Sequence, residues 1–180
     1  QNDQSITEFG SLDHALEWCE NQPLEEVEHC SDRVSRSALH YVAGLFESPD
    51  DAARFRRYLT EVSFPQGEEL IRQGVASLDL FFLEEGDVSV YLQSSTGDLV
   101  RIRRTGSGTV LGELGFYLNT PRTASVIADG PGKAYRLTTE ALQAMESEHP
   151  ELATALHRFM ADLLAERLLR TTRTLEAVLG

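Results

Sequence analysis

Hydrophobic and polar positions change their spacing along the chain and divide it into three zones. Residues 1–60 show helical spacing, and one predicted helix face holds Leu12, Ala15, Leu16 and Cys19. Residues 38–46 form a second apolar patch. The segment SPDD at 48–51 predicts a helix start, because Pro49 suits a first turn and acids suit the positive end of the helix dipole. We expect this helix to run through Leu59.

Between residues 61 and 137, short runs of branched and aromatic residues alternate with glycines. The stretch LDLFFLEEGDVSVYL at 78–92 predicts two strands joined at Glu85-Gly86. The turn signal SSTGD at 94–98 precedes another predicted strand, LVRIRR. The regular spacing of these turns is typical of an antiparallel barrel or jelly roll.

Residues 138–180 return to helical spacing. Thr138 or Thr139 caps a short predicted helix that ends before Pro150, and Pro150 opens a long one. The long helix carries one apolar stripe: Leu152, Leu156, Phe159, Leu163, Leu168, Thr171, Leu175 and Val178. We expect the stripe to cover the open end of the barrel; a mobile lid or a homodimer seam is the alternative. The predicted fold class is α+β: an antiparallel β jelly-roll barrel (a double-stranded β-helix) with flanking N-terminal helices and a C-terminal helical lid.

Composition narrows the possible functions. The 180 residues are 41% hydrophobic and 25% charged, which suits one compact domain with extra elements. The net charge is −13, and neither residues 1–60 (12 acids, 5 bases) nor the remainder (17 acids, 11 bases) is basic. This disfavours binding to nucleic acid. The chain begins at Gln1 rather than Met and shows no signal peptide or membrane-length apolar run, so we expect a piece of a longer protein.

Catalytic and metal-binding patterns are missing from the sequence. The two cysteines, Cys19 and Cys30, have no CxxC or Cys/His ligand spacing, and the five histidines are scattered. No Ser/His/Asp or Cys/His arrangement stands out, and no paired carboxylates are present to hold the metal that phosphodiester hydrolysis usually needs. The sequence therefore predicts neither an enzyme nor a metal site.

The stretch GELGFYLNTPRTASV at 112–126 carries the candidate chemistry. Its glycines allow close backbone approach, and a one-turn helix starting near Glu113 would leave amides free to bind an anion. Arg122 adds a planar fork able to pair two phosphate oxygens, and Thr123 adds a hydroxyl. Glu113 suits a sugar, because an ionised carboxylate accepts hydrogen bonds from hydroxyls. An internal Glu113–Arg122 salt bridge is the equally weighted alternative.

This stretch resembles the phosphate-binding cassette of cyclic nucleotide-binding domains, and FPQGEELIRQGVASLDLFFLEEGDVSVYL at 64–92 resembles the first strands of that family. The resemblance implies that Glu113 accepts from the ribose 2′-hydroxyl and that Arg122 pairs with the cyclic phosphate. The implied ligand-binding residues are Gly112, Glu113, Leu114, Gly115, Arg122, Thr123 and Ala124. The implied ligand is cAMP, with cGMP nearly level because Thr123 matches a guanine-contacting position in family members that accept cGMP.

Two further features concern the base of the ligand. Arg103 and Thr105 are polar where many family members carry apolar residues that pack against the base, so the chain departs from the family pattern there. Arg158, Arg167 and Arg170 on the long helix are candidates for stacking on the base. This helix is also the element that we expect to close over the ligand and transmit its signal.

The segment SITEFGSLDHALEWCEN at 5–21 resembles the last helix of a STAS domain. STAS domains sit at the cytoplasmic end of SulP-type anion permeases. This resemblance implies a division into 1–48, an N-terminal helical segment ending a STAS-like domain, and 49–180, the cyclic nucleotide-binding domain with its lid helices. The implied location is the cytoplasmic side of an inner-membrane protein, with a covalently linked transporter. A CRP-type transcription factor, a regulatory segment of an enzyme and a degenerate domain without ligand are the alternatives.

Overall fold

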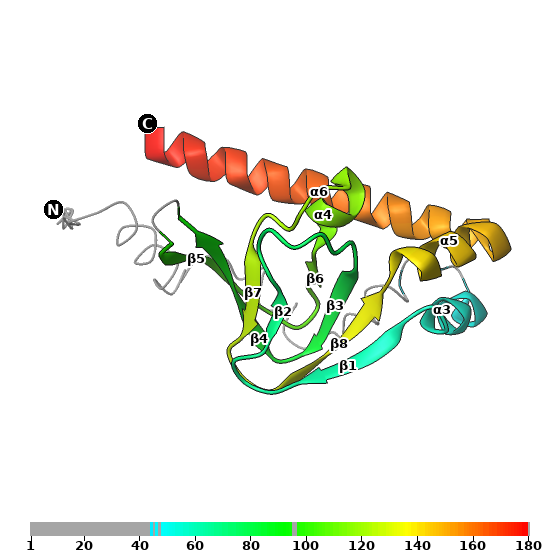
Figure 1. The fold of residues 1–180 in the computed structure, drawn as a ribbon. Helices are drawn as coiled ribbons and strands as arrows, with labels where there is room; N and C mark the ends of the chain where they lie inside the picture. The colour runs from blue at the N-terminus through cyan, green and yellow to red at the C-terminus, as the bar shows by residue number, and fades with distance from the viewer. Residues whose placement is uncertain (1–43, 45, 47, 95–96, 180) are drawn as a thin grey trace, which may run out of the picture.

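The computed structural model describes residues 44, 46, 48–94 and 97–179 of the chain. Within them, two four-stranded sheets pack face to face, and every strand pair is antiparallel (Figure 1). The first sheet has the order β1 (Thr60–Phe64), β8 (Gly132–Leu137), β3 (Leu80–Glu85) and β6 (Val110–Leu111). The second sheet has the order β2 (Glu69–Ile71), β7 (Ser125–Ala128), β4 (Asp87–Gln93) and β5 (Leu99–Gly106). The predicted jelly roll is confirmed as a sandwich of two sheets.

The strand β3 of the first sheet is buried on both faces. Side chains of a strand point alternately to opposite faces. In the run LFFL, Leu80 and Phe82 pack in a cluster with the helices, whereas Phe81 and Leu83 pack between the two sheets. The continuous apolar run is therefore explained by two cores, one on each side of the same strand.

Four helices flank the sheets in the described residues: α3 (Pro49–Arg56), α4 (Glu113–Leu118), α5 (Thr139–Glu148) and α6 (Pro150–Leu179). Ser48 caps α3 by accepting a hydrogen bond from the amide of Asp50, and Thr138 caps α5, as predicted. The helix α3 ends three residues before the predicted Leu59. The amides of residues 57–59 bond three residues back, and this tighter turn buries Leu59 before β1 begins.

The apolar side chains of α6 that pack on the sandwich lie in the first half of the helix. Leu152 and Leu156 are fully buried, and Phe159 and Leu163 pack against the same cluster. Leu168, a member of the predicted stripe, is 69% exposed. The expectation that the whole stripe covers the sandwich is therefore wrong for Leu168, because the helix continues past the packed cluster (Figure 1).

Predictions for the first 43 residues, including the STAS-like helix, fall outside the described residues. The division into 1–48 and 49–180 accordingly stays a prediction. Within the described part of the chain, no helix combines the length and the apolar character that crossing a bilayer requires.

Candidate functional site

All seven residues implied by the cassette resemblance line a single cavity of about 200 Å³. The cavity lies beside α4, and apolar side chains from both sheets complete it: Ile71, Val90, Leu111 and Val126. Arg103 and Thr105 of β5 and Arg167 of α6 also line it. The structure therefore brings the predicted residues together and adds three polar side chains from other elements.

The backbone at Gly112 has a conformation and a clearance that only glycine fits. Its φ is +86°, and a Cβ placed there would lie 2.5 Å from Nη1 of Arg122 and 2.8 Å from the carbonyl oxygen of Asp79. At Gly115 a Cβ would lie 3.3 Å from Cδ of Arg122. The two glycines thus let the loop close around the arginine side chain.

The short helix predicted at Glu113 is confirmed as α4. Its first intrahelical bond runs from the amide of Phe116 to the carbonyl of Gly112, at 3.1 Å, and no side chain caps its N-terminus. The amides of residues 113–115 therefore have no intrahelical acceptor. Asn119, with φ +51°, ends the helix.

Arg122 is buried, with 4% of its surface exposed, and the protein holds both its backbone and its side chain. Its amide donates to the carbonyl of Val75 at 3.0 Å, and its carbonyl accepts from the amide of Gly74 at 2.8 Å. Nη1 donates to the carbonyl of Gly112 at 2.8 Å, and Nη2 donates to the carbonyl of Asp79 at 2.5 Å and to Oγ of Ser77 at 3.2 Å.

This arrangement differs from the two-oxygen phosphate fork that the sequence predicted. Both terminal nitrogens of Arg122 already donate to protein oxygens. Its Nε is the one buried side-chain nitrogen or oxygen without a hydrogen-bond partner in the described part of the chain. Burial lowers the pKa of Arg122, and the nearby charges of Asp79 and Glu113 oppose that shift. A buried N–H without an acceptor is costly, so this nitrogen is left with an unmet hydrogen bond.

Glu113 forms an ion pair with Arg167 of α6 rather than with Arg122. The second terminal nitrogen of Arg167 donates to the carbonyl of Val110 at 2.7 Å. The side chains of Arg167 and Glu113 are 21% and 12% exposed. The internal Glu113–Arg122 salt bridge considered from the sequence is therefore wrong, and the acid is held by the long helix.

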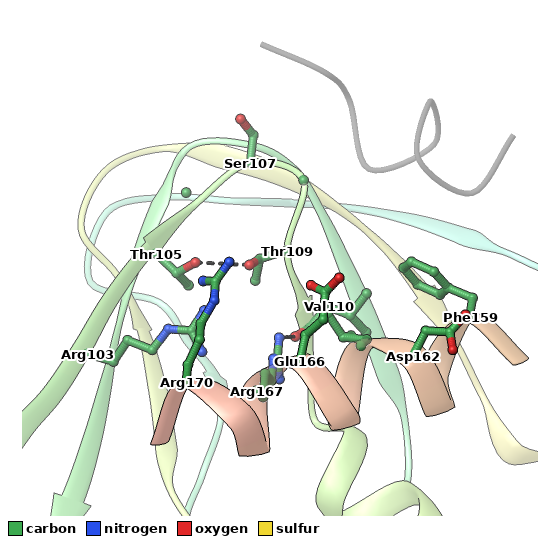
Figure 2. A pocket seen from close by; sticks show the side chains of 13 residues that line it. Arg103, Thr105, Ser107, Thr109, Val110, Phe159, Asp162, Glu166, Arg167 and Arg170 are labelled. Carbon is green, nitrogen blue, oxygen red and sulfur yellow. Dashed lines mark hydrogen bonds between the residues drawn. The ribbon is translucent and has the colours of Figure 1, made fainter. Parts of the chain in front are cut away.

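A second cavity of about 450 Å³ lies between the β5–β6 turn and α6. Arg103, Thr105 and Arg167 line both cavities, so the two spaces share a wall. Figure 2 shows Arg170 directed toward the hydroxyls of Thr105 and Thr109, which lie 2.9 Å apart. Of the three arginines predicted to stack on the base, Arg167 and Arg170 line this cavity. Arg158 instead lines a separate groove with Phe46 and Asp51.

A second link joins α4 to α6. The hydroxyl of Tyr117 lies 2.9 Å from Nδ1 of His157, and Nε2 of His157 lies 3.2 Å from Glu146 of α5. Burial, with a smaller contribution from Glu146, raises the pKa of Tyr117 to about 12. The cassette helix is thus connected to both C-terminal helices through polar contacts.

Sequence reasoning missed the groups that brace Arg122. Asp79 contributes a backbone carbonyl, which any residue could supply, and Ser77 lies 45 positions away in the chain. Neither contact leaves a signal in the sequence. Arg167 was a candidate for the base, whereas the structure pairs it with Glu113. Within the described ranges, no group of three or more His, Cys, Asp or Glu residues is arranged to hold a metal ion.

Comparisons with known proteins concern the fold. Residues 61–149 match the family model of the cyclic nucleotide-binding domain. A crystal structure of a cyclic nucleotide-binding domain from Methylobacillus flagellatus is similar, with a TM-score of 0.66, 21% identity, and coverage of 74% of this chain and 82% of that one. The chain has the fold of a cyclic nucleotide-binding domain.

Two curated relatives are similar in sequence to parts of this chain. Glutaminase 2 of Bradyrhizobium diazoefficiens is 32% identical over 91% of this chain and 26% of its own length. The cAMP-dependent protein kinase type II regulatory subunit of Drosophila melanogaster is 40% identical over 40% of this chain and 19% of its own length. The chain thus spans about a quarter or less of each of these relatives.

Proposed function

We propose that this chain is a non-catalytic regulatory segment that binds a cyclic nucleotide monophosphate in the cavity beside α4. The single observation that carries the proposal is the buried Nε of Arg122, which has no partner among the described residues although its side chain lines the cavity. An exocyclic phosphate oxygen would satisfy this donor. The amides of residues 113–115 supply further donors at the same place.

The residues present fit a small cyclic phosphate. Gly112 and Gly115 both line the cavity, and neither places a side chain over the backbone that a phosphate would approach. The phosphodiester carries one negative charge, and the guanidinium of Arg122 lies beside it with a matching positive charge. Glu113, which lines the same cavity, would then accept a hydrogen bond from the ribose.

The base of the ligand would enter the second cavity, and its lining favours guanine. Arg103 lines both cavities, and a guanidinium only donates hydrogen bonds. Guanine offers two adjacent acceptors, O6 and N7, to such a group, whereas adenine places a donor amino group beside N7. We therefore expect cGMP to bind more tightly than cAMP, with Thr123 in the first cavity as a second polar contact.

The larger protein to which this segment belongs has two candidates. The likeness to Glutaminase 2 favours an enzyme. The match covers 91% of this chain, and the 9% that it leaves out is shorter than the segment before Gly44. The match therefore includes part of that segment. The STAS-like residues 5–21 favour a SulP-type anion transporter, with this domain on the cytoplasmic side of the membrane. Because only the first candidate rests on most of the chain, we propose regulation of a glutaminase-type enzyme as the first to test.

The distal half of α6 offers a surface for a second copy of the chain. Leu168 and Leu169 are 69% and 51% exposed on this half, beyond the part of the helix that packs on the sheets. A pair of such helices would cover them. Sedimentation velocity across a hundredfold concentration range tests this proposal, which predicts a concentration-dependent dimer; a monomer throughout would contradict it.

Thermal unfolding with added ligands tests the proposed function. The chain is titrated with cGMP, cAMP and a cyclic dinucleotide. The control ligand is 5′-GMP, whose phosphate does not form a ring. A ligand at 100 times its dissociation constant adds about 2.7 kcal/mol to the free energy of unfolding. We expect a stabilising shift with cGMP and cAMP and little with 5′-GMP. No shift with any cyclic nucleotide would show a degenerate domain that keeps the fold alone.

A further inference from the structure

Arg167 connects the long helix to both ends of the segment that enters the cassette. One terminal nitrogen pairs with Glu113, the first residue of α4, and the other donates to the carbonyl of Val110 in β6 at 2.7 Å. Both charged side chains are largely buried. Arg167 also forms part of the wall shared by the two cavities. The position of Arg167 therefore depends on α6, while its guanidinium binds the carboxylate of Glu113 in the cassette.

The ion pair leaves acceptor capacity on the carboxylate. Arg167 contacts Oε1 of Glu113, and Oε2 accepts no hydrogen bond from the described residues. An ionised carboxylate has about four acceptor positions over its two oxygens. A sugar hydroxyl and Arg167 can therefore bind Glu113 at the same time.

Charge gives the ion pair a second effect on a phosphate-containing ligand. Glu113 lines the same cavity as Arg122, so an unpaired carboxylate would repel an incoming phosphate. Arg167, which lies on α6, neutralises the charge of Glu113 through the ion pair. It also restricts the rotamers of Glu113, so less conformational freedom is lost when the hydroxyl binds.

We propose that Arg167 is a positioning residue, which orients Glu113 for the sugar 2′-hydroxyl and thereby couples ligand binding to the docking of α6. This inference rests on the proposed function. Linkage makes the coupling reciprocal: if docked α6 raises the affinity for the nucleotide, the nucleotide stabilises docked α6 by the same factor. The ion pair of Arg167 and Glu113 thus links the bound ligand to α6.

Calorimetric titration of the full chain with cGMP and with its 2′-deoxy analogue tests the inference. We expect Arg167→Gln to weaken cGMP binding by about tenfold and the 2′-deoxy analogue by only about threefold, because the analogue loses the neutralisation of Glu113 but has no 2′-hydroxyl contact to lose. Arg167→Lys should recover part of the loss. Arg173→Gln, which removes the same charge from an exposed position of α6, is the matched control and should bind normally.

Hydrogen exchange of α6 amides gives a second readout. In the wild-type chain, saturating cGMP should slow exchange around residue 167, and in Arg167→Gln this protection should be largely lost. Equal weakening of both ligands, unchanged cGMP affinity, or tighter binding in Arg167→Gln would overturn the inference while leaving the proposed function intact. If the wild-type chain binds no cyclic nucleotide, the proposed function fails, and the inference fails with it.

Discussion

The two ends of the candidate cleft are built in opposite ways. At the phosphate end, Arg122 is 4% exposed, and its terminal nitrogens are held by the carbonyl oxygens of Gly112 and Asp79. At the base end, Arg103 and Arg170 are exposed and come from β5 and α6, distant parts of the chain. A fixed end suits a group common to all ligands, and an open end suits a group that varies. We therefore expect affinity to depend on the phosphate end and selectivity on the base end.

The largest effect should come from Arg122→Ala. Removing one partner of a buried charge pair costs about 2–5 kcal/mol of binding, so the affinity for any cyclic nucleotide should fall by at least about 30-fold. Calorimetry measures this loss for cAMP and cGMP alike. Arg158→Ala, in a separate groove, is the control. Unchanged affinity in Arg122→Ala would remove the phosphate end from the account.

The next effect in size should come from Gly112→Ala. The new side chain would need a positive φ and would meet Nη1 of Arg122 and the carbonyl of Asp79. We expect the free energy of unfolding to fall by about 1–3 kcal/mol and ligand affinity to fall with it. Gly130→Ala is a matched control, since a Cβ there has nothing within 4 Å. Equal stability of the two variants in denaturant titrations would show that the phosphate end is not rigid.

A smaller effect, confined to selectivity, should come from Arg103→Gln at the base end. A bidentate arginine–guanine contact is worth about 1–3 kcal/mol of discrimination, so the preference for cGMP over cAMP should fall by about tenfold. The affinity for cAMP should change by less than about twofold. Competition binding with both nucleotides measures the ratio. A parallel loss of both affinities would place Arg103 in the phosphate end instead.

The smallest effect should come from Leu168→Ala. Because this side chain is 69% exposed, its removal should change the free energy of unfolding by no more than about 0.5 kcal/mol at low protein concentration. Chemical denaturation gives the value. A loss above about 1.5 kcal/mol would mean that the distal half of α6 is covered by another surface, and the base end would then be less open than described.

How much of the fold and the site the sequence could predict depends on whether a feature rests on neighbouring or on distant residues of the chain. The hairpin at Gly86, the cap at Thr138 and the short helix at Glu113 follow from local signals, because each depends on residues a few positions apart. The cassette glycines Gly112 and Gly115 are also local, and the structure explains them through Arg122, ten and seven positions later in the chain.

Contacts between distant residues left no local signal. The ion pair of Glu113 joins residues 54 positions apart, and Arg122 is held by a backbone carbonyl that any residue at position 79 would supply. The exposed Leu168 follows the same helical spacing as the buried Leu156, so periodicity alone could not tell where α6 leaves the core. These features depend on tertiary packing, which the spacing of residues in one chain does not encode.

Observation of the Arg122 side chain by nuclear magnetic resonance tests the central claim most directly. The Nε–H of this buried guanidinium is the donor without a partner among the described residues, so it should report the arrival of a phosphate oxygen. The account predicts a clear chemical-shift change of this resonance on saturation with cGMP or cAMP, and none with guanosine, which lacks the phosphate. An unchanged Arg122 resonance in a chain saturated with cyclic nucleotide would contradict the account.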